Sequence, residues 1–293
     1  MKIALFSDVH GSLRIILHLI RNWQWAHHTH LDAALIAGDL GCFPDPAKFD
    51  PPTKRWTDRV PEEAGFSKFF TRPVPEVARL FEGEYGVRCP ILFVPGNHED
   101  YEFISGRAAT TQHAPGAPEN TFAVDCYQRF HAIRDGAMAT LLGSDDTRLR
   151  VAGLWGIENT RPHAPYRINP VAVRNIQRLG PQSIDVLLTH DAPADAHPIG
   201  GSPLITGIIK SCAPPVHVFG HVHPVDGVHE YRVPNRRTKS FIFKNVTFGP
   251  QGRDGLTGVM GLMDWNGADA SVEVLNESWL KQMRHDTWQY SGS

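Results

Sequence analysis

Five short apolar segments of the chain each end in a cluster of polar residues that can bind a metal ion. The segments are residues 2–6, 33–37, 91–94, 185–188 and 216–219. Their length, their apolar character and the turn residues that follow them are typical of buried strands. In an open α/β sheet, ligands bind outside the carboxyl ends of the strands, where residues far apart in sequence meet. The pattern therefore predicts an α/β protein whose functional site lies at that edge.

Helix-like segments lie between or beside these strands, at residues 13–25, 170–179 and 205–210. In the first of them the apolar residues recur at steps of three and four, which is typical of an amphipathic helix. Residues 41–90 are rich in proline and charge and contain one helix-like segment, 75–81. We interpret residues 41–90 as an insertion, or cap, over the site.

The remaining segments have the character of β-strands. Short β-prone pieces at residues 122–124, 139–142 and 149–152 are expected to belong to a second sheet. Further strands are expected at residues 240–244, 258–263 and 272–275. No repeat or clear linker divides the chain. Hydrophobic residues make up 41% and charged residues 20% of the sequence, as in ordinary globular proteins, so we expect one domain over residues 1–293.

Composition also restricts the partners. The formal net charge of −2 disfavours nucleic-acid binding through bulk charge, although it leaves a local basic patch open. The N-terminal apolar run ends at Ser7, and no stretch approaches about 18 apolar residues, so no membrane segment is expected. Four cysteines lie far apart and form no C-x-x-C pair: Cys42, Cys89, Cys126 and Cys212. We expect reduced thiols and a cytoplasmic protein.

Two of the polar clusters have the spacing of metal ligands. Asp8 and His10 are separated by one residue, as are His221 and His223. Alternate side chains of an extended segment share a face, so each pair can reach one ion. One such triplet arises often by chance, but five clusters in order do not. Imidazole, carboxylate and amide donors without thiolate favour Mn²⁺, Fe²⁺/Fe³⁺ or Zn²⁺ over Ca²⁺.

In their order along the chain, the clusters resemble the five motif blocks of the calcineurin-like metallophosphoesterase family. The blocks are Asp8-x-His10, Gly38-Asp39, Gly96-Asn97-His98-Glu99, His190 and Gly220-His221-x-His223. The resemblance covers roughly residues 2–224 and rests on about a dozen of them. It implies an α/β (α+β) fold, a four-layer α/β/β/α sandwich of two mixed β-sheets flanked by helices, with a dinuclear metal site.

The resemblance also implies a role for each residue of the blocks. One metal would be bound by Asp8, His10 and His223, the other by Asn97, His190 and His221, and Asp39 would bridge the two. Two divalent ions less two carboxylate charges leave a site of about +2 for an anionic phosphate ester. A water between the ions would become hydroxide near neutral pH and attack phosphorus in line. His98 would donate a proton to the leaving oxygen, or else only orient the ligands.

Residues near the clusters have less distinctive patterns. Arg161 and His163 lie in a loop after residues 149–152 and could contact a phosphate or a base of the substrate, although an ordinary surface loop also explains them. Asp191 could orient His190, cap a helix or lie in solvent.

The expected function is hydrolysis of a phosphoester bond, with a small phosphoester or nucleotide as substrate. The motifs do not separate a phosphodiesterase from a phosphomonoesterase or protein phosphatase. A roof formed by residues 41–90 would favour a small or narrow substrate and, with it, a phosphodiesterase acting on nucleotides or small diesters. A noncatalytic binding module of the same fold is disfavoured because no predicted ligand is missing. The oligomeric state stays open.

Overall fold

The computed structural model describes residues 1–111, 116–159, 161, 163–194, 200–222, 227–233, 236–246 and 255–283. The strands are β1 (Lys2–Phe6), β2 (Ala33–Ile36), β3 (Ile91–Phe93), β4 (Thr121–Ala123), β5 (Phe130–Ile133), β6 (Met138–Leu142), β7 (Arg148–Leu154), β8 (Val186–Thr189), β9 (Val216–Phe219), β10 (Gly227–Val233), β11 (Arg236–Ile242), β12 (Gly261–Trp265) and β13 (Ala270–Val274). The α-helices are α1 (Leu13–His27), α2 (Pro51–Trp56), α3 (Gly65–Phe69), α4 (Pro75–Ala78), α5 (Tyr101–Thr110), α6 (Pro170–Arg178), α7 (Pro203–Cys212) and α8 (Ser278–Gln282), and the 3₁₀ helices are η1 (Pro46–Lys48), η2 (Pro61–Ala64) and η3 (Arg79–Phe81).

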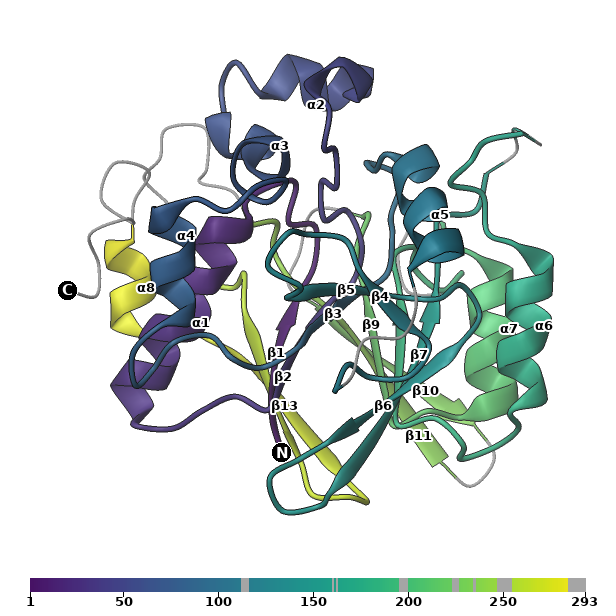
Figure 1. Cartoon of the computed structure of the whole chain (residues 1–293). Coiled ribbons are helices and arrows are strands. Elements are labelled where there is room, and N and C mark those ends of the chain that lie inside the picture. The colour runs from purple at the N-terminus through teal and green to yellow at the C-terminus, as the bar shows by residue number, and fades with distance from the viewer. Residues whose placement is uncertain are drawn as a thin grey trace.

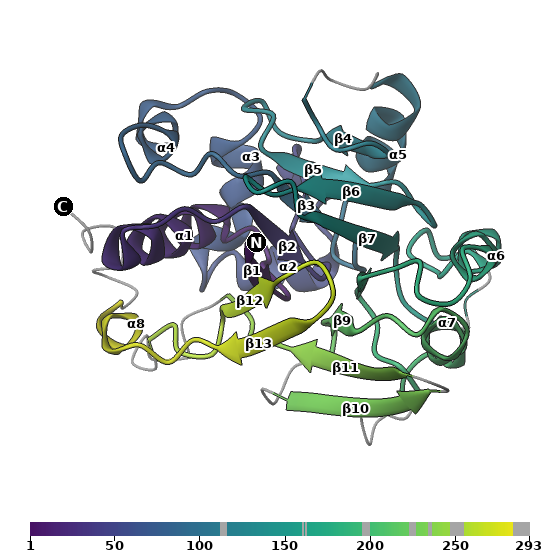
Figure 2. The same ribbon diagram turned by 90° about the horizontal axis from the view of Figure 1, so that it is seen from below.

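The strands form two mixed sheets packed face to face. The first has the order β13-β12-β1-β2-β3-β5-β4, and the second has the order β10-β11-β9-β8-β7-β6. Helices α1, α4 and α8 lie on one side of the pair of sheets, and α6 and α7 lie on the other (Figure 1; Figure 2). The four-layer α/β/β/α sandwich that the resemblance implied is confirmed.

Alternating side chains explain why β1 is buried on both faces. Ile3 and Leu5 pack between the two sheets, whereas Ala4 and Phe6 pack against the helical layer that contains α1. A strand points successive side chains to opposite faces, so a continuous apolar run fits a strand covered on both sides. β8 repeats this pattern. Leu187 is buried beneath α6 and α7, whereas the residues before and after it point between the two sheets.

Most predicted elements form close to the expected bounds, but one prediction of sheet membership is wrong. Residues 122–124 were expected in the second sheet, whereas β4 pairs with β5 at the edge of the first. β5, which the sequence patterns did not predict, joins β3 in parallel through Ile91 and Phe130. Phe122 and Phe130 lie in the cluster on the helical side of that sheet. A strand of three residues has too short a pattern to specify its partner strand.

Residues 41–90 form a series of short helices, η1, α2, η2, α3, α4 and η3. α2 lies at the top of the molecule in Figure 1, beyond the ends of the first strands. The boundaries of an insertion here, and a single domain over the whole chain, stay predictions. No helix in the described part of the chain is long and apolar enough to cross a membrane. The cysteines are free thiols, of which Cys126 alone is exposed.

Candidate metal centre

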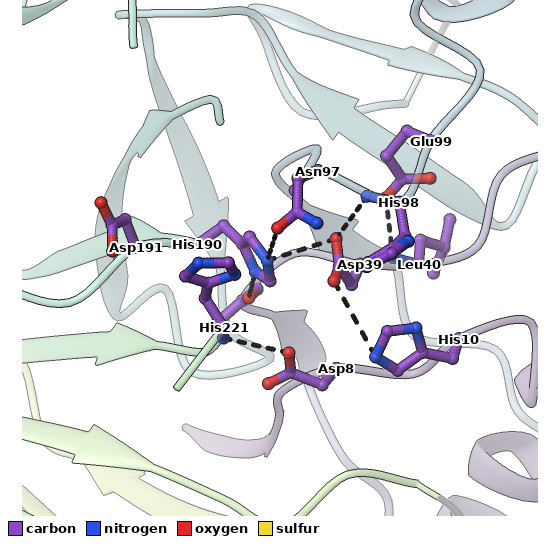
Figure 3. A network of polar contacts seen from close by, with 12 residues as sticks. Asp8, His10, Asp39, Leu40, Asn97, His98, Glu99, His190, Asp191 and His221 are labelled. Atoms are coloured by element: carbon purple, nitrogen blue, oxygen red, sulfur yellow. Dashed lines mark hydrogen bonds and ion pairs between the residues drawn. The ribbon is translucent and has the colours of Figure 1, made fainter. Parts of the chain in front are cut away.

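The five polar clusters meet at the carboxyl ends of parallel strands. β1, β2 and β3 are parallel neighbours in the first sheet, and β8 and β9 are parallel neighbours in the second. The turns after these strands carry the side chains drawn in Figure 3. The site therefore lies where the two sheets face each other at one end, as the sequence pattern predicted.

Three of the predicted ligands form the buried centre of the cluster. Asp8, Asp39 and His190 each offer a ligand atom within 4.8 Å of the other two. All three side chains are buried, and no solvent reaches His190 or Asp39. Burying two carboxylates together costs free energy unless a cation compensates their charge. The arrangement thus has the composition and the burial of a metal site.

The polar atoms around the His190 ring show where a cation is needed. Nδ1 of His190 donates a hydrogen bond to the carbonyl oxygen of Ala37 at 2.9 Å, because that oxygen can only accept. Nε2 then faces Asp39 Oδ1 and Asn97 Oδ1, each 3.2 Å away. A neutral ring would direct a lone pair at two acceptor oxygens, so a proton or a metal ion must lie between these atoms.

Electrostatics of the metal-free chain agree with this requirement. Burial by itself would lower the pKa of His190, but the charge of Asp39 and a hydrogen bond with it raise that pKa to about 10. Burial would raise the pKa of Asp39, whereas His190, His10 and His98 hold it well below its usual range. Asp39 Oδ2 is buried and receives no hydrogen bond from the described residues; His10 Nε2 lies 3.8 Å from it. These ligand atoms suit a metal ion, which would take the place of the proton between His190 and Asp39.

Three further predicted ligands surround this centre and are half-buried. They are His10, Asn97 and His221. The rings of His190 and His221 lie 5.2 Å apart between centroids, and the ring of His10 lies 5.4 Å from that of His98. The cluster therefore has a buried interior and partly exposed residues around it.

Strained backbone holds several of the side chains in place. Four predicted ligands have left-handed φ angles: Asp8 at 49°, His10 at 46°, Asp39 at 47° and His221 at 68°. Residues other than glycine rarely adopt this region, and such strain gathers at functional sites. Hydrogen bonds between the clusters offset the cost of this strain. His98 N donates to Asp39 Oδ1 at 2.8 Å, and His221 N donates to Asp8 Oδ1 at 3.0 Å.

His98 is held by a carboxylate that the sequence reasoning missed. Nδ1 of His98 bonds to Oδ2 of Asp50 at 2.7 Å, so Nε2 is the ring nitrogen that can exchange a proton with a substrate. Burial alone would lower the pKa of His98, but this hydrogen bond and the charge of Asp39 raise it to about 9. Asp50 is also the N-cap of α2, where its Oδ1 accepts from Thr53 N. The Asp-Pro-Pro sequence signals such a cap, but nothing in it indicates contact with His98.

Other buried carboxyl groups support the turns. Glu99 accepts hydrogen bonds from the amides of Leu40 and Cys42, and burial raises its pKa to about 8. Glu63, in η2, is buried, and burial raises its pKa to about 8 although the charge of His98 opposes this. Asp191 is buried and accepts from Glu158 N at 2.8 Å. It therefore fixes the neighbouring loop and does not lie in solvent.

For three predicted site residues the structure shows no contact with this centre. His223 lies outside the described residues. Arg161 and His163 are exposed, and the backbone N–H of Arg161 donates a hydrogen bond to Asn159 Oδ1 at 2.7 Å. Contact of these two side chains with a substrate stays a prediction.

Comparison with known proteins adds an independent observation. The family model described as calcineurin-like phosphoesterase matches residues 1–225. A lariat debranching enzyme from Arabidopsis thaliana is 23% identical over 207 residues, which are 69% of this chain and 44% of that protein. The chain thus spans less than half the length of this curated relative. One solved crystal structure is similar at 17% identity, with a TM-score of 0.49, and the match covers 94% of this chain and 99% of that one.

Proposed function

Because the chain belongs to the calcineurin-like phosphoesterase family, we propose that it hydrolyses phosphoester bonds with metal ions bound at the cluster of Asp8, Asp39 and His190. One observation carries this proposal: His190 Nε2, Asp39 Oδ1 and Asn97 Oδ1 converge within hydrogen-bonding distance although all three can act as acceptors. Such a set of atoms binds a cation, and a cation attracts an anionic ester.

We propose that the site holds two metal ions. The ligand set would be Asp8, His10, Asp39, Asn97, His190, His221 and His223, with Asp39 between the ions because its two carboxylate oxygens face His190 and His10. Bound ions would supply an activated water and neutralise the charge on the phosphoryl oxygens. Mn²⁺, iron and Zn²⁺ all suit these donors.

The protein's own residues supply the proton. His98 is half-buried beside the cluster, and its Nδ1 is occupied by Asp50. Its Nε2 can therefore carry a proton to the leaving oxygen as the phosphorus–oxygen bond breaks. Asp50 fixes the ring and stabilises its protonated form, as a carboxylate does beside a catalytic histidine.

A phosphodiester is the substrate that we favour. The cap contributes Asp50 directly to the site, which restricts the space beside His98 and favours a narrow substrate. The similarity to a lariat debranching enzyme supports the same choice. A phosphomonoester is the alternative.

The first experiment measures metal content and substrate class together. After reconstitution with Mn²⁺, we expect up to two ions per chain and hydrolysis of bis-p-nitrophenyl phosphate faster than of p-nitrophenyl phosphate. A preference for the monoester would reverse the choice of substrate. Absence of hydrolysis of any phosphoester by a metal-loaded sample would reject the proposed function.

His98→Asn tests the proton donor. The rate on diesters with poor leaving groups should fall about 100-fold, within the range of general acid catalysis, while metal content stays the same. The loss of rate should be much smaller for bis-p-nitrophenyl phosphate, because its leaving group, p-nitrophenolate, leaves without protonation. The matched control is His28→Asn, because His28 is exposed at the left-handed C-cap of α1, where asparagine is well tolerated. Unchanged rates in His98→Asn would remove the acid assignment.

A further inference from the structure

The cap carries an exposed aromatic side chain. Trp56, at the end of α2, is 41% exposed, although a tryptophan gains more than any other side chain from burial. The guanidinium of Arg59 lies 5.5 Å from the centre of its ring. The ring and the guanidinium are thus held together at the surface, and the ring remains accessible.

Three exposed cations lie on α2 or just after it, and one of them, Arg59, contacts the ring. Lys54, Arg55 and Arg59 are exposed, and none of them forms an ion pair within the described parts of the chain. Asp58 is the one acidic residue between Lys54 and Arg59, so this segment has a net charge of +2. The chain as a whole has a charge of −2. We refer to Lys54, Arg55, Trp56 and Arg59 as the patch; the segment that contains them has a positive net charge, whereas the chain as a whole has a negative one.

The patch is joined to the metal centre through α2. Asp50, at the N-cap of that helix, contacts His98. Six residues of helix extend about 9 Å at the usual rise, so α2 separates Trp56 from Asp50 by about that distance along its axis. In Figure 1, α2 lies beyond the strand ends that carry the centre. A strand whose phosphate is cleaved at the centre could reach the patch.

We propose that this patch binds single-stranded nucleic acid, with a base stacked on Trp56 and neighbouring phosphates held by Lys54, Arg55 and Arg59. Aromatic stacking platforms flanked by arginine and lysine suit such strands, because every base has a π face and every linkage carries a charge. A small phosphomonoester has neither the length nor the base to use this surface. The inference rests on the proposed function, since it names the substrate class of the same site.

The test compares Trp56→Ala with Trp25→Ala. Trp25 is another exposed tryptophan, 62% accessible, on α1. Binding of a fluorescein-labelled single-stranded oligonucleotide is measured by fluorescence anisotropy, with a chelator present so that the strand stays intact. The dissociation constant should rise about tenfold in Trp56→Ala, the order expected for loss of one stacked base, and stay within twofold in Trp25→Ala. Circular dichroism melting of both variants excludes unfolding.

Three further measurements separate the contributions of base and charge. Arg55→Ala should reduce the slope of log affinity against log salt by about one, as expected for the loss of one phosphate contact. Inorganic polyphosphate should bind the wild type and Trp56→Ala equally, because it has no base to stack. In the metal-loaded enzyme, the ratio of kcat/KM for the oligonucleotide to that for bis-p-nitrophenyl phosphate should fall about tenfold in Trp56→Ala.

Equal oligonucleotide affinities in the wild type, Trp56→Ala and Trp25→Ala would overturn the inference. An equal loss of oligonucleotide and polyphosphate affinity in Trp56→Ala would overturn the stacking of a base. Because the anisotropy measurement needs no turnover, this failure is distinct from that of the proposed function, which depends on hydrolysis of small esters.

Discussion

His190 and His217 are both fully buried, but their neighbours give the two rings opposite charge preferences. His190 faces the carboxylate of Asp39, which raises its pKa to about 10. His217 lies between the hydroxyls of Thr189 and Ser240, each 2.9 Å away, and burial lowers its pKa to about 3. Burial alone disfavours the charged ring, and only a nearby negative charge reverses this. A buried histidine in this chain is therefore a candidate ligand only where a carboxylate lies beside it.

The contact between Asp50 and His98 leads to a prediction at the same scale. In Asp50→Asn the side chain can still cap α2, since asparagine is as good an N-cap as aspartate, but its charge beside His98 is lost. We expect kcat for diesters with poor leaving groups to fall about tenfold, with KM and metal content unchanged. Steady-state kinetics and metal analysis measure these quantities.

Asp45→Asn is the matched control for this prediction. Asp45 is the N-cap of η1 and accepts from Ala47 N at the surface, so its replacement changes a cap without changing the site. A rise in KM with unchanged kcat in Asp50→Asn would show that Asp50 acts on substrate binding and not through His98.

At the scale of elements, the unit formed by β3, the following turn and α5 positions Asn97 and His98, which lie in that turn. Tyr101, the first residue of α5, donates a hydrogen bond to the carbonyl oxygen of Gly96 at 2.7 Å. Asp100 caps the helix by accepting from Phe103 N. Helix and turn are thus tied together, which fixes the direction of Asn97 and His98 relative to the strand.

Close packing of this turn predicts a severe effect of Gly96→Ala. A Cβ at Gly96 would lie 2.5 Å from the Asp39 amide nitrogen and closer still to its Oδ1. Neither backbone nor ligand can move without disturbing the cluster, so we expect a loss of about 1–3 kcal/mol in the free energy of unfolding and a smaller rise in melting temperature on addition of Mn²⁺. Urea unfolding and thermal melts measure both.

Gly106→Ala, in the same unit, should have the opposite effect on the free energy of unfolding. Gly106 is inside α5, and a Cβ there meets no atom within 4 Å. Alanine should stabilise the helix by up to about 1 kcal/mol. If the two variants behaved alike, steric crowding at Gly96 would not be the cause.

At the scale of the whole molecule, the site depends on two sheets that each supply part of it. β1, β2 and β3 supply Asp8, Asp39 and Asn97, while β8 and β9 supply His190 and His221. The apolar layer between the sheets, which includes Leu5 and Leu188, holds the two groups of ligands at a fixed separation. The stability of sheet packing and the geometry of the centre are therefore linked.

The pKa of His217 allows us to predict how that stability depends on pH. It lies on β9 between β8 and β11, and its pKa of about 3 in the native protein is below the ordinary value of about 6.5. The unfolded chain therefore binds a proton that the native one does not, so stability is lost as pH falls from about 6.5 towards 3. This residue should contribute up to about 1.4 kcal/mol per pH unit in that range.

His217→Gln isolates this contribution. Other groups titrate equally in both proteins, so the variant should lose less free energy of unfolding than the wild type between pH 7 and pH 5, whatever its stability at pH 7. Urea unfolding at several pH values measures the two slopes. Parallel curves would show that the native His217 is protonated like an exposed histidine.

The sequence by itself determined most of the strands and the order of the polar clusters, because apolar runs and the residues that end them are local patterns. It therefore predicted that Asp8, Asp39 and His190 meet, and the structure places them within 4.8 Å. The sequence did not predict the contact between His98 and Asp50, 48 positions apart. Nor did it predict the sheet to which β4 belongs. These depend on how α2 and a short strand pack, and no period or spacing in the chain records that packing; only the tertiary structure decides it.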